Sequence, residues 1–92
     1  MRKFGRFGSE PGQFNFPAEL AFDRDDNLLV CDSYNARMQV FKPDGTPIAQ
    51  FGEKGESDHQ FMRPTGVCLA DDGRIFVADF DNQRVNVFGY AS

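Results

Sequence analysis

Hydrophobic residues of this chain occur in short runs, and polar turn residues separate each run from the next. Several runs are rich in Val, Ile and Phe, which favour strands, and none keeps a helical period of 3.6 residues for long enough to predict a helix. The sequence therefore predicts an all-β protein. The expected strands are Leu20–Phe22, Leu28–Cys31, Arg37–Phe41 and Ile48–Phe51, then Val67–Leu69, Ile75–Ala78 and Val85–Phe88.

The segments between the expected strands carry turn-forming residues. Those that predict tight turns are residues 23–27, 43–45 and 71–73. In the first of them Asp23, Asp25 and Asn27 resemble the first half of a calcium loop, but the Gly and the distant Glu that complete such a loop are absent. We therefore interpret this segment as the polar turn of a hairpin.

The whole pattern occurs twice, and the second repeat follows 47 residues after the first, as Phe4-Gly5 and Phe51-Gly52 illustrate. A period in the forties with short strands is typical of propeller blades, which expose apolar faces until neighbouring blades cover them. Each repeat is expected to supply strands a, b, c and d of a four-stranded antiparallel blade. We assign residues 14–52 to the first blade and residues 61–88 to strands a to c of the second.

The strand d that the second repeat lacks has its counterpart at the start of the sequence, where residues 1–5 align with residues 48–52. The chain is expected to form a single unit, residues 1–92, that begins with a strand d and ends with a strand c. In strand c both alternating sets of side chains are apolar, which is expected when a sheet is covered on both faces. Two blades alone would leave two such faces exposed, and exposed apolar faces mark interaction surfaces.

The two repeats resemble the NHL repeat. The motifs that carry the resemblance are Gln13-Phe14-x-x-Pro17 with Val30-x-Asp32-x-x-Asn35-x-Arg37-x-x-Val40-Phe41, and Gln60-Phe61-x-x-Pro64 with Val77-x-Asp79-x-x-Asn82-x-Arg84-x-x-Val87-Phe88. The chain departs from the family at Ala36 and Gln83, where His is common, and at Glu19, which replaces a Gly that the second repeat keeps as Gly66. The resemblance implies a β-propeller, usually six-bladed, whose d-to-a and b-to-c loops bind partners.

Six blades from a chain of two blades imply three chains. We expect a homotrimer of about 31 kDa, built from chains of 10.4 kDa. Strand exchange would close it, because the N-terminal strand of each molecule can add to the terminal strand c of a neighbour and remove an open edge. The residues expected in this contact are Arg2, Lys3, Phe4, Val85, Val87 and Phe88. The alternative is a fragment of a longer chain with six repeats.

Charge and composition narrow the classes of partner. The net charge of −4 and the pI near 4.7 disfavour a sequence-independent grip on nucleic acid, which requires clustered Lys and Arg. No apolar run approaches the ~20 residues of a membrane span, so no membrane association is expected. We interpret Cys31 and Cys68 as reduced, buried thiols, which favours a cytoplasmic protein.

Two pairs of oppositely charged residues lie at the ends of the b-to-c loops. Asp32 and Arg37 flank the first loop, and a hairpin-like loop brings its ends together, so we expect an ion pair that fixes the loop. The same pair is expected between Asp79 and Arg84 in the second loop. Both pairs are interpreted as structural.

Aromatic, cationic and amide side chains of the loops are the candidate binding residues, since such groups on one rim can stack on bases and hold phosphates. These candidates are Tyr34, Arg63, Phe80, Phe16, Lys54 and Gln83. In the alternative interpretation Phe16 and Phe80 pack between the blades. Acidic residues in the same loops weigh against RNA.

Nothing in the sequence supports catalysis, and no metal or cofactor is expected. His59 is the only histidine, and neither a catalytic triad nor a phosphate-binding loop is found. We favour a non-catalytic propeller unit that self-assembles and binds protein or single-stranded RNA, similar to the propellers of tripartite-motif NHL proteins. A purely structural or engineered self-assembling fragment and a metal-dependent enzyme similar to the peptidyl-hydroxyglycine lyases remain as alternatives.

Overall fold

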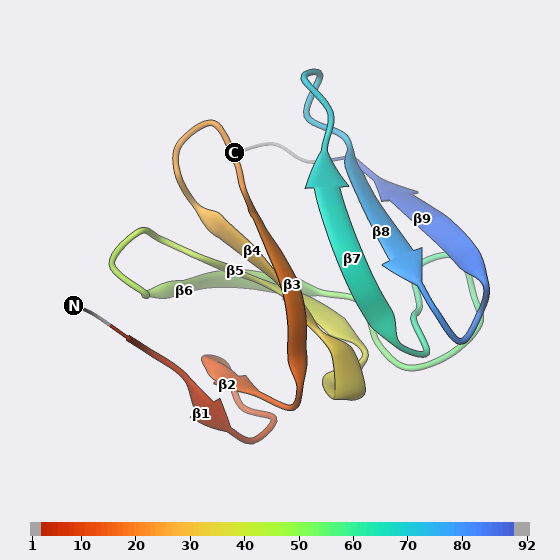
Figure 1. Cartoon of the computed structure of the whole chain (residues 1–92), viewed down its shortest axis with the longest axis horizontal. Coiled ribbons are helices and arrows are strands. Elements are labelled where there is room, and N and C mark those ends of the chain that lie inside the picture. Colours follow the sequence, from red (N-terminus) through yellow and green to blue (C-terminus); the bar gives the residue numbers. More distant parts are fainter. Residues whose placement is uncertain (1–2, 90–92) are drawn as a thin grey trace.

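The computed structural model describes residues 3–89, and they confirm the all-β prediction (Figure 1). Blade 1 is a four-stranded antiparallel sheet, in the order β3 (Pro17–Phe22), β4 (Leu28–Asp32), β5 (Arg37–Phe41), β6 (Pro47–Phe51). Blade 2 is a three-stranded antiparallel sheet, in the order β7 (Pro64–Leu69), β8 (Ile75–Asp79), β9 (Arg84–Phe88). The short parallel pair β1 (Arg6–Phe7) and β2 (Gln13–Phe14) precedes blade 1, and the 3₁₀ helix η1 (Ser33–Asn35) joins β4 to β5.

The turn between β3 and β4 shows how the sequence specifies a hairpin. Oδ1 of Asp23 accepts the backbone N–H groups of Asp25 at 2.8 Å and of Asn27 at 2.9 Å, and Oδ2 accepts Nδ2–H of Asn27 at 2.9 Å. A short acidic side chain that binds the backbone just ahead of it is a favoured turn device. The prediction of a polar turn is confirmed, since this carboxylate is engaged with its own loop.

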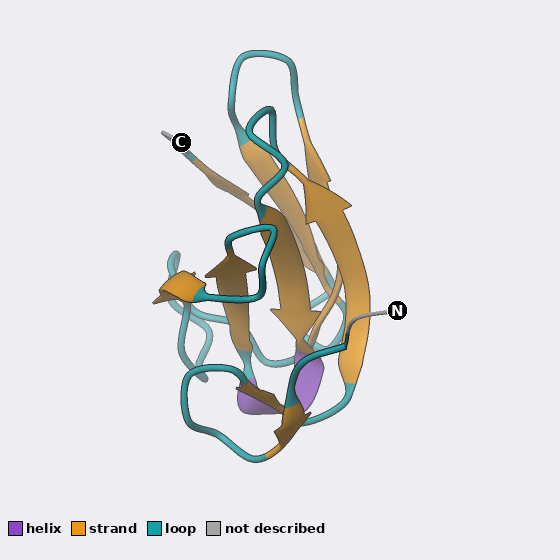
Figure 2. Ribbon diagram, turned by 90° about the vertical axis from the view of Figure 1, so that its left-hand side faces the viewer, coloured by secondary structure: helices purple, strands orange, loops and turns teal. Residues whose placement is uncertain are grey.

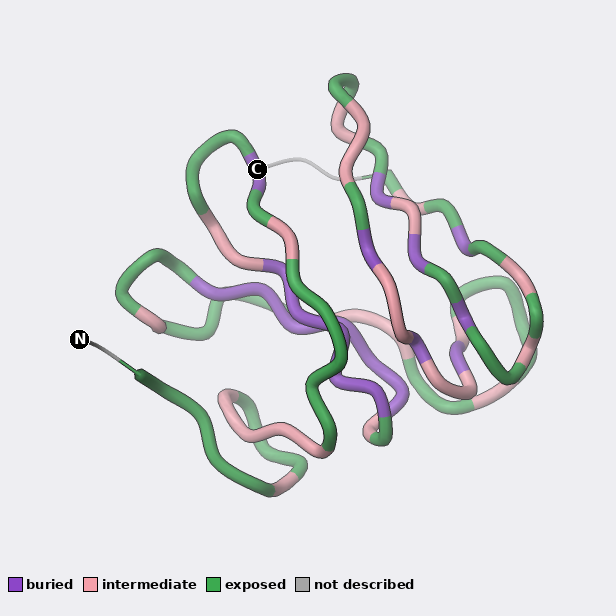
Figure 3. The backbone as a smooth tube through the Cα atoms, in the orientation of Figure 1, coloured by how far each residue is buried: buried purple, intermediate pink, exposed green. Residues whose placement is uncertain are grey.

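The two blades pack face to face around one hydrophobic core, with strands β3 and β7 beside each other (Figure 1). The chain is flat, with extents of 36 × 32 × 17 Å, and Figure 2 shows it from the side. The buried core residues are Leu29, Cys31, Ala36, Met38, Val40, Phe61, Val67, Ile75 and Val77. Because strand residues alternate between the two faces of a sheet, each blade has a second face that no other blade covers, and Figure 3 shows β3 largely exposed. On that face of blade 1, Val30, Gln39 and Phe41 are nevertheless buried.

The two cysteines differ in environment, and the prediction for one of them is wrong. Cys31 is buried between the blades, and burial, with a further contribution from the charge of Glu19, raises the pKa of its thiol to about 12. Cys68 is a free thiol but is exposed rather than buried. It lies on β7 and alternates with the buried Val67, so it points to the face of blade 2 that no blade covers.

The N-terminal segment makes one contact that the repeat explains. Residues 3–5 belong to no strand, and residues 1–2, including Arg2 of the expected strand exchange, lie outside the described residues. The ring of Phe4 packs on Phe41 at 5.1 Å between centroids, and Phe51 packs on Phe88 at 5.0 Å. Phe4 therefore contacts blade 1 in the same way as Phe51, at the end of strand d of blade 1, contacts blade 2. Within residues 3–89 no helix is long and apolar enough to cross a membrane.

Candidate binding face

The d-to-a and b-to-c loops of both blades meet at one end of the sheets. Strand β3 begins where β4 ends, since Pro17 pairs with Asp32, and β5 begins where β6 ends, since Met38 pairs with Phe51. We define the loop face as residues 8–16, 33–36, 52–63 and 80–83. All ligand-binding candidates from the sequence fall on it.

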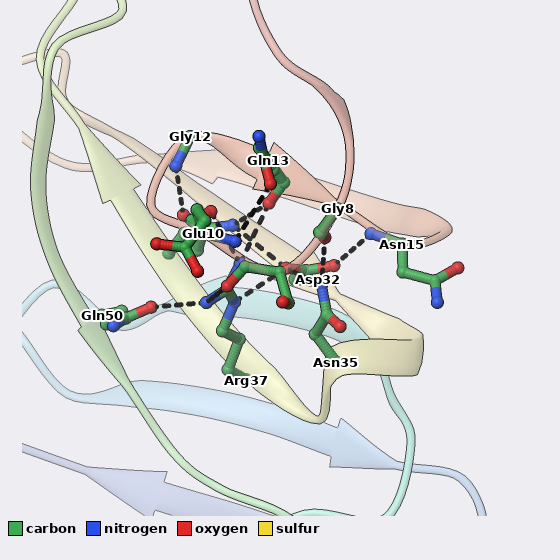
Figure 4. A network of polar contacts seen from close by, with 11 residues as sticks. Gly8, Glu10, Gly12, Gln13, Asn15, Asp32, Asn35, Arg37 and Gln50 are labelled. Atoms are coloured by element: carbon green, nitrogen blue, oxygen red, sulfur yellow. Dashed lines mark hydrogen bonds and ion pairs between the residues drawn. The ribbon is translucent and has the colours of Figure 1, made fainter.

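The buried Asp32 carboxylate organises the first half of this face (Figure 4). Its Oδ2 accepts Nε–H of Arg37 at 2.8 Å, Nδ2–H of Asn35 at 3.0 Å and Nε2–H of Gln39 at 3.0 Å. Its Oδ1 accepts the backbone N–H of Asn15 at 2.8 Å. The ion pair expected here is present, with side chains that are 10% and 0% exposed. Charge-assisted bonds of this kind are stronger than neutral ones, so the loop is fixed in place.

Arg37 extends the network to the preceding loop and to β6 (Figure 4). Its Nη1 donates to the backbone oxygen of Ser9 and to Oε1 of Gln50, both at 2.8 Å. Its Nη2 donates to the backbone oxygens of Glu10 at 3.2 Å and Gln13 at 3.0 Å. The guanidinium thus links β5 to three backbone oxygens of the preceding loop and to a side chain of β6.

In the second repeat the expected ion pair between Asp79 and Arg84 is not formed, which corrects the sequence prediction. The Asp79 carboxylate instead accepts the backbone N–H groups of Met62 at 3.0 Å and Arg63 at 2.9 Å, and Nδ2–H of Asn82 at 2.8 Å. Arg84 donates to backbone oxygens of the preceding loop, including that of Glu56 at 2.7 Å, while its Nε is buried without a hydrogen-bond partner.

Two differences between the repeats explain this change. Phe16 adopts a φ of 62°, and its N–H is not among the donors to Asp32, whereas its counterpart Arg63 donates its N–H to Asp79. In addition Asn86, the shorter counterpart of Gln39, donates to the Gln60 backbone oxygen rather than to the carboxylate. The carboxylate of the second repeat therefore accepts a second backbone N–H, that of Arg63, and lacks the Arg and Gln side-chain donors of the first repeat.

Phe16 and Tyr34 form an exposed aromatic pair above the Asp32 network. Their rings stack with centroids 5.0 Å apart and planes 17° apart, and the residues are 64% and 55% exposed. A positive φ is a rare conformation for a bulky residue such as Phe16, and backbone bonds hold it, since Ser33 N–H donates to its oxygen at 3.3 Å. Within a single molecule Phe16 is therefore not packed between the two blades.

The equivalent positions of the second repeat carry a charged cluster. Arg63 lies over the ring of Phe80, 4.8 Å from its centroid, and forms an ion pair with Asp81 at 3.0 Å. Phe80 is exposed and so, like Phe16, does not pack between the blades. Lys54 and Gln83 are exposed on the same face, and the backbone N–H of Gln83 donates to the backbone oxygen of Phe80 at 3.3 Å.

Glu19 is a contact residue that the sequence reasoning did not identify. Its Oε1 accepts the backbone N–H of Val67 at 2.7 Å and so joins β3 to β7 across the two blades. The counterpart of Glu19 is Gly66, and a Cβ there would lie 3.2 Å from the same oxygen. In the sequence, this contact was signalled by Glu19 itself, which replaces the glycine that the family has at this position. In the described part of the chain no three His, Cys, Asp or Glu side chains are grouped to hold a metal ion.

Two antiparallel blades with this repeated loop network define a segment of a β-propeller, and comparison with known proteins identifies its class. The NHL repeat model matches residues 14–41 and 61–88, so the chain belongs to the NHL repeat family, and the resemblance is confirmed. It is 41% identical to protein brain tumor of Drosophila melanogaster over 56 residues, and 42% identical to the E3 ubiquitin-protein ligase TRIM32 of Mus musculus over 45 residues. These matches cover 61% and 49% of this chain but only 5% and 7% of the relatives.

Proposed function

We propose that this chain is a non-catalytic NHL-type propeller building block that self-assembles and offers its loop face to a protein or to single-stranded RNA. The observation that carries the proposal is the rigid exposure of aromatic rings on that face. Asp32 and Arg37 are committed to fixing the loop, so Phe16 and Tyr34 are held in solvent on an ordered frame. Rigid aromatic anchors bind with little loss of conformational entropy.

A protein partner is favoured over RNA. The chain has a net charge of −4, and Arg63, the cation that lies over the exposed ring of Phe80, is already paired with Asp81. Binding to the phosphate backbone depends on cations that are free to replace counterions. Single-stranded RNA remains the second candidate because the stacked pair Phe16 and Tyr34 is a surface on which bases stack.

Substitution of Tyr34 by alanine tests the loop face. Peptides selected for binding to the wild-type protein from a displayed random library are expected to bind Tyr34→Ala about 10-fold or more weakly, since a central aromatic anchor contributes about 2 kcal/mol. Ile48→Ala is the matched control, because Ile48 is an exposed apolar residue on β6 away from the loop face, and it is expected to bind normally.

The result that assigns RNA instead is measured on the same variants. A fluorescent pool of random single-stranded RNA is expected to bind weakly at low salt and without dependence on Tyr34. Tight binding of this pool that is lost in Tyr34→Ala would show that the loop face binds RNA rather than protein. Equal affinity of the selected peptides for Tyr34→Ala and wild type would show that the loop face is not the binding surface.

The self-assembling part of the proposal is a homotrimer that completes six blades by strand exchange. It is supported by the open edge of β9, which lacks a fourth strand within residues 3–89, and by the position of Phe4 against Phe41. In the assembly Lys3 and Phe4 of one molecule would pair along Val85, Val87 and Phe88 of another. The free thiols of Cys31 and Cys68 support the proposed cytoplasmic location.

Mass in solution tests the assembly. Light scattering at micromolar concentration is expected to give about 31 kDa, the mass of three chains of 10.4 kDa. A single species of 10.4 kDa at every concentration that can be measured would refute self-assembly.

A further inference from the structure

The contact between the two blades shows how one blade of this chain covers another. Blade 1 contributes Leu29, Cys31, Met38 and Val40 to this contact, and blade 2 contributes Phe61, Val67, Ile75 and Val77. Each group comes from one face of its sheet, and the two groups are different sets of repeat positions. The contact is therefore head to tail, and each blade has one face of each kind.

Each of the two contact faces has a counterpart in the other blade, and that counterpart lies on the outside of the molecule. Val85 and Val87, which correspond to the buried Met38 and Val40, are 61% and 52% exposed on the open face of blade 2. Leu20, which corresponds to the buried Val67, is 53% exposed on the open face of blade 1.

Most of the remaining members of the two faces follow the same rule. The exceptions are Val30 and Phe41 on blade 1, which are already buried in the single molecule. The open face of blade 2 also holds Phe76, Ala78 and Cys68, and the open face of blade 1 also holds Phe22 and Leu28. Their counterparts in the other blade lie in or against the core between the blades.

We infer that the open face of blade 2 in one molecule packs on the open face of blade 1 in another, in the arrangement that joins the two blades within one chain. This inference rests on the proposed self-assembly and names the surfaces that carry it. The occupant is another molecule of this chain because the two open faces are the counterparts of two faces that already fit each other. A head-to-tail contact closes into a ring when its repeated rotation completes a full turn, and a closed ring leaves no open face.

On the open face of blade 1, Phe4 makes the same kind of aromatic contact that joins the two blades within the chain. Within the chain, Phe88 of blade 2 is contacted by Phe51 from blade 1 at 5.0 Å and by Phe61 at 5.6 Å. On blade 1, Phe41 is contacted in the same way by Phe4 at 5.1 Å and by Phe14 at 5.5 Å. The aromatic part of the interface is thus already formed at the open side of blade 1.

One bond of the closed interface has no counterpart between molecules. Glu19 accepts the N–H of Val67 between the blades of one chain, but its counterpart Gly66 has no side chain to accept the N–H of Leu20 in a neighbour. The contact between molecules therefore lacks this hydrogen bond, and we expect dilution to separate molecules while the two blades of each stay together.

The native Cys68 thiol reports whether these faces meet. Its counterpart Ala21 packs against the core, so contact with a neighbour is expected to bury Cys68. Cys31 does not interfere, because it is buried and its pKa of about 12 leaves almost no reactive thiolate at neutral pH. The rate of labelling by a maleimide is expected to fall at least 10-fold between the dilute protein and the assembled protein.

A variant and a matched control place the contact on the named face. Val87→Asp is expected to stay at 10.4 kDa with a fully reactive Cys68 and an unchanged far-ultraviolet circular dichroism spectrum, because Val87 is half exposed in a single molecule. Ser57→Asp introduces the same charge at an exposed residue of the loop between β6 and β7, which belongs to the loop face and to neither open face, and is expected to assemble as wild type.

The outcomes separate this inference from the proposed self-assembly. A mass of about 31 kDa with Cys68 as reactive as in Val87→Asp, or an assembly that Val87→Asp leaves intact, overturns the assignment of the faces while self-assembly stands. A wild-type mass of 10.4 kDa at every concentration overturns self-assembly itself. Protection of Cys68 in wild type and Ser57→Asp, with its loss in Val87→Asp, supports both.

Discussion

Replacing Asp32 with alanine is expected to lower the free energy of unfolding by about 3–5 kcal/mol. The substitution leaves the buried Arg37 guanidinium without its counter-charge and removes one of the two acceptors of Asn35 and of Gln39. An uncompensated buried charge is far more costly than the loss of an exposed ion pair. Small domains have only about 5–15 kcal/mol in total, so the variant is expected to unfold at a much lower urea concentration.

The matched control for this prediction is Asp72→Ala. Asp72 pairs with Arg74 at 2.8 Å, but both side chains are more than half exposed, so no measurable change in the urea midpoint is expected. Both variants are compared with wild type at one protein concentration, because self-association adds to apparent stability. If Asp32→Ala unfolds at the same midpoint as Asp72→Ala, the buried network does not stabilise the fold.

Replacing Phe61 with alanine is expected to cost a similar amount, about 3–5 kcal/mol, for a different reason. The Phe61 side chain is fully buried in the core between the blades and contacts the ring of Phe88. It also fills the space over Gly52, where a Cβ would lie 2.4 Å from the ring, so its removal leaves a cavity that the backbone turn cannot close.

The control for Phe61→Ala is Phe7→Ala. Phe7 is 80% exposed, so its truncation removes little buried area, and the thermal midpoint is expected to stay close to that of wild type. Equal losses in the two variants would contradict the position of Phe61 in the core. The comparison uses the same side chain in both places and so isolates burial as the variable.

Much of the candidate site follows from short-range rules that act on the sequence alone. The Asp23 turn forms because a carboxylate binds backbone N–H groups two and four residues ahead, whatever surrounds it. The pair of Asp32 and Arg37 forms because β4 and β5 are adjacent antiparallel strands in which these two residues lie directly opposite each other. Both features were predictable from residue type and spacing.

The second repeat shows where such prediction fails. Asp79 and Arg84 lie opposite each other in β8 and β9 as their counterparts do in blade 1, yet they form no ion pair in residues 3–89. The difference arises from the backbone conformation of Phe16 in the first repeat and from the shorter side chain of Asn86 in the second. The first of these effects depends on a rare φ angle, which residue type does not reveal.

The strands of the two blades, their turns, the repeat and the family could be predicted from the sequence, because hydrophobic alternation and turn residues act over a few positions and the motifs occur twice in register. The short strands β1 and β2 were not predicted. Which faces of the sheets are covered became clear from the packing of the blades alone. Met38 is buried and its counterpart Val85 is exposed, although both are apolar residues at the same position of a strand. The physical reason is that alternation fixes the side of the sheet to which a residue points, whereas burial depends on whether another blade lies there.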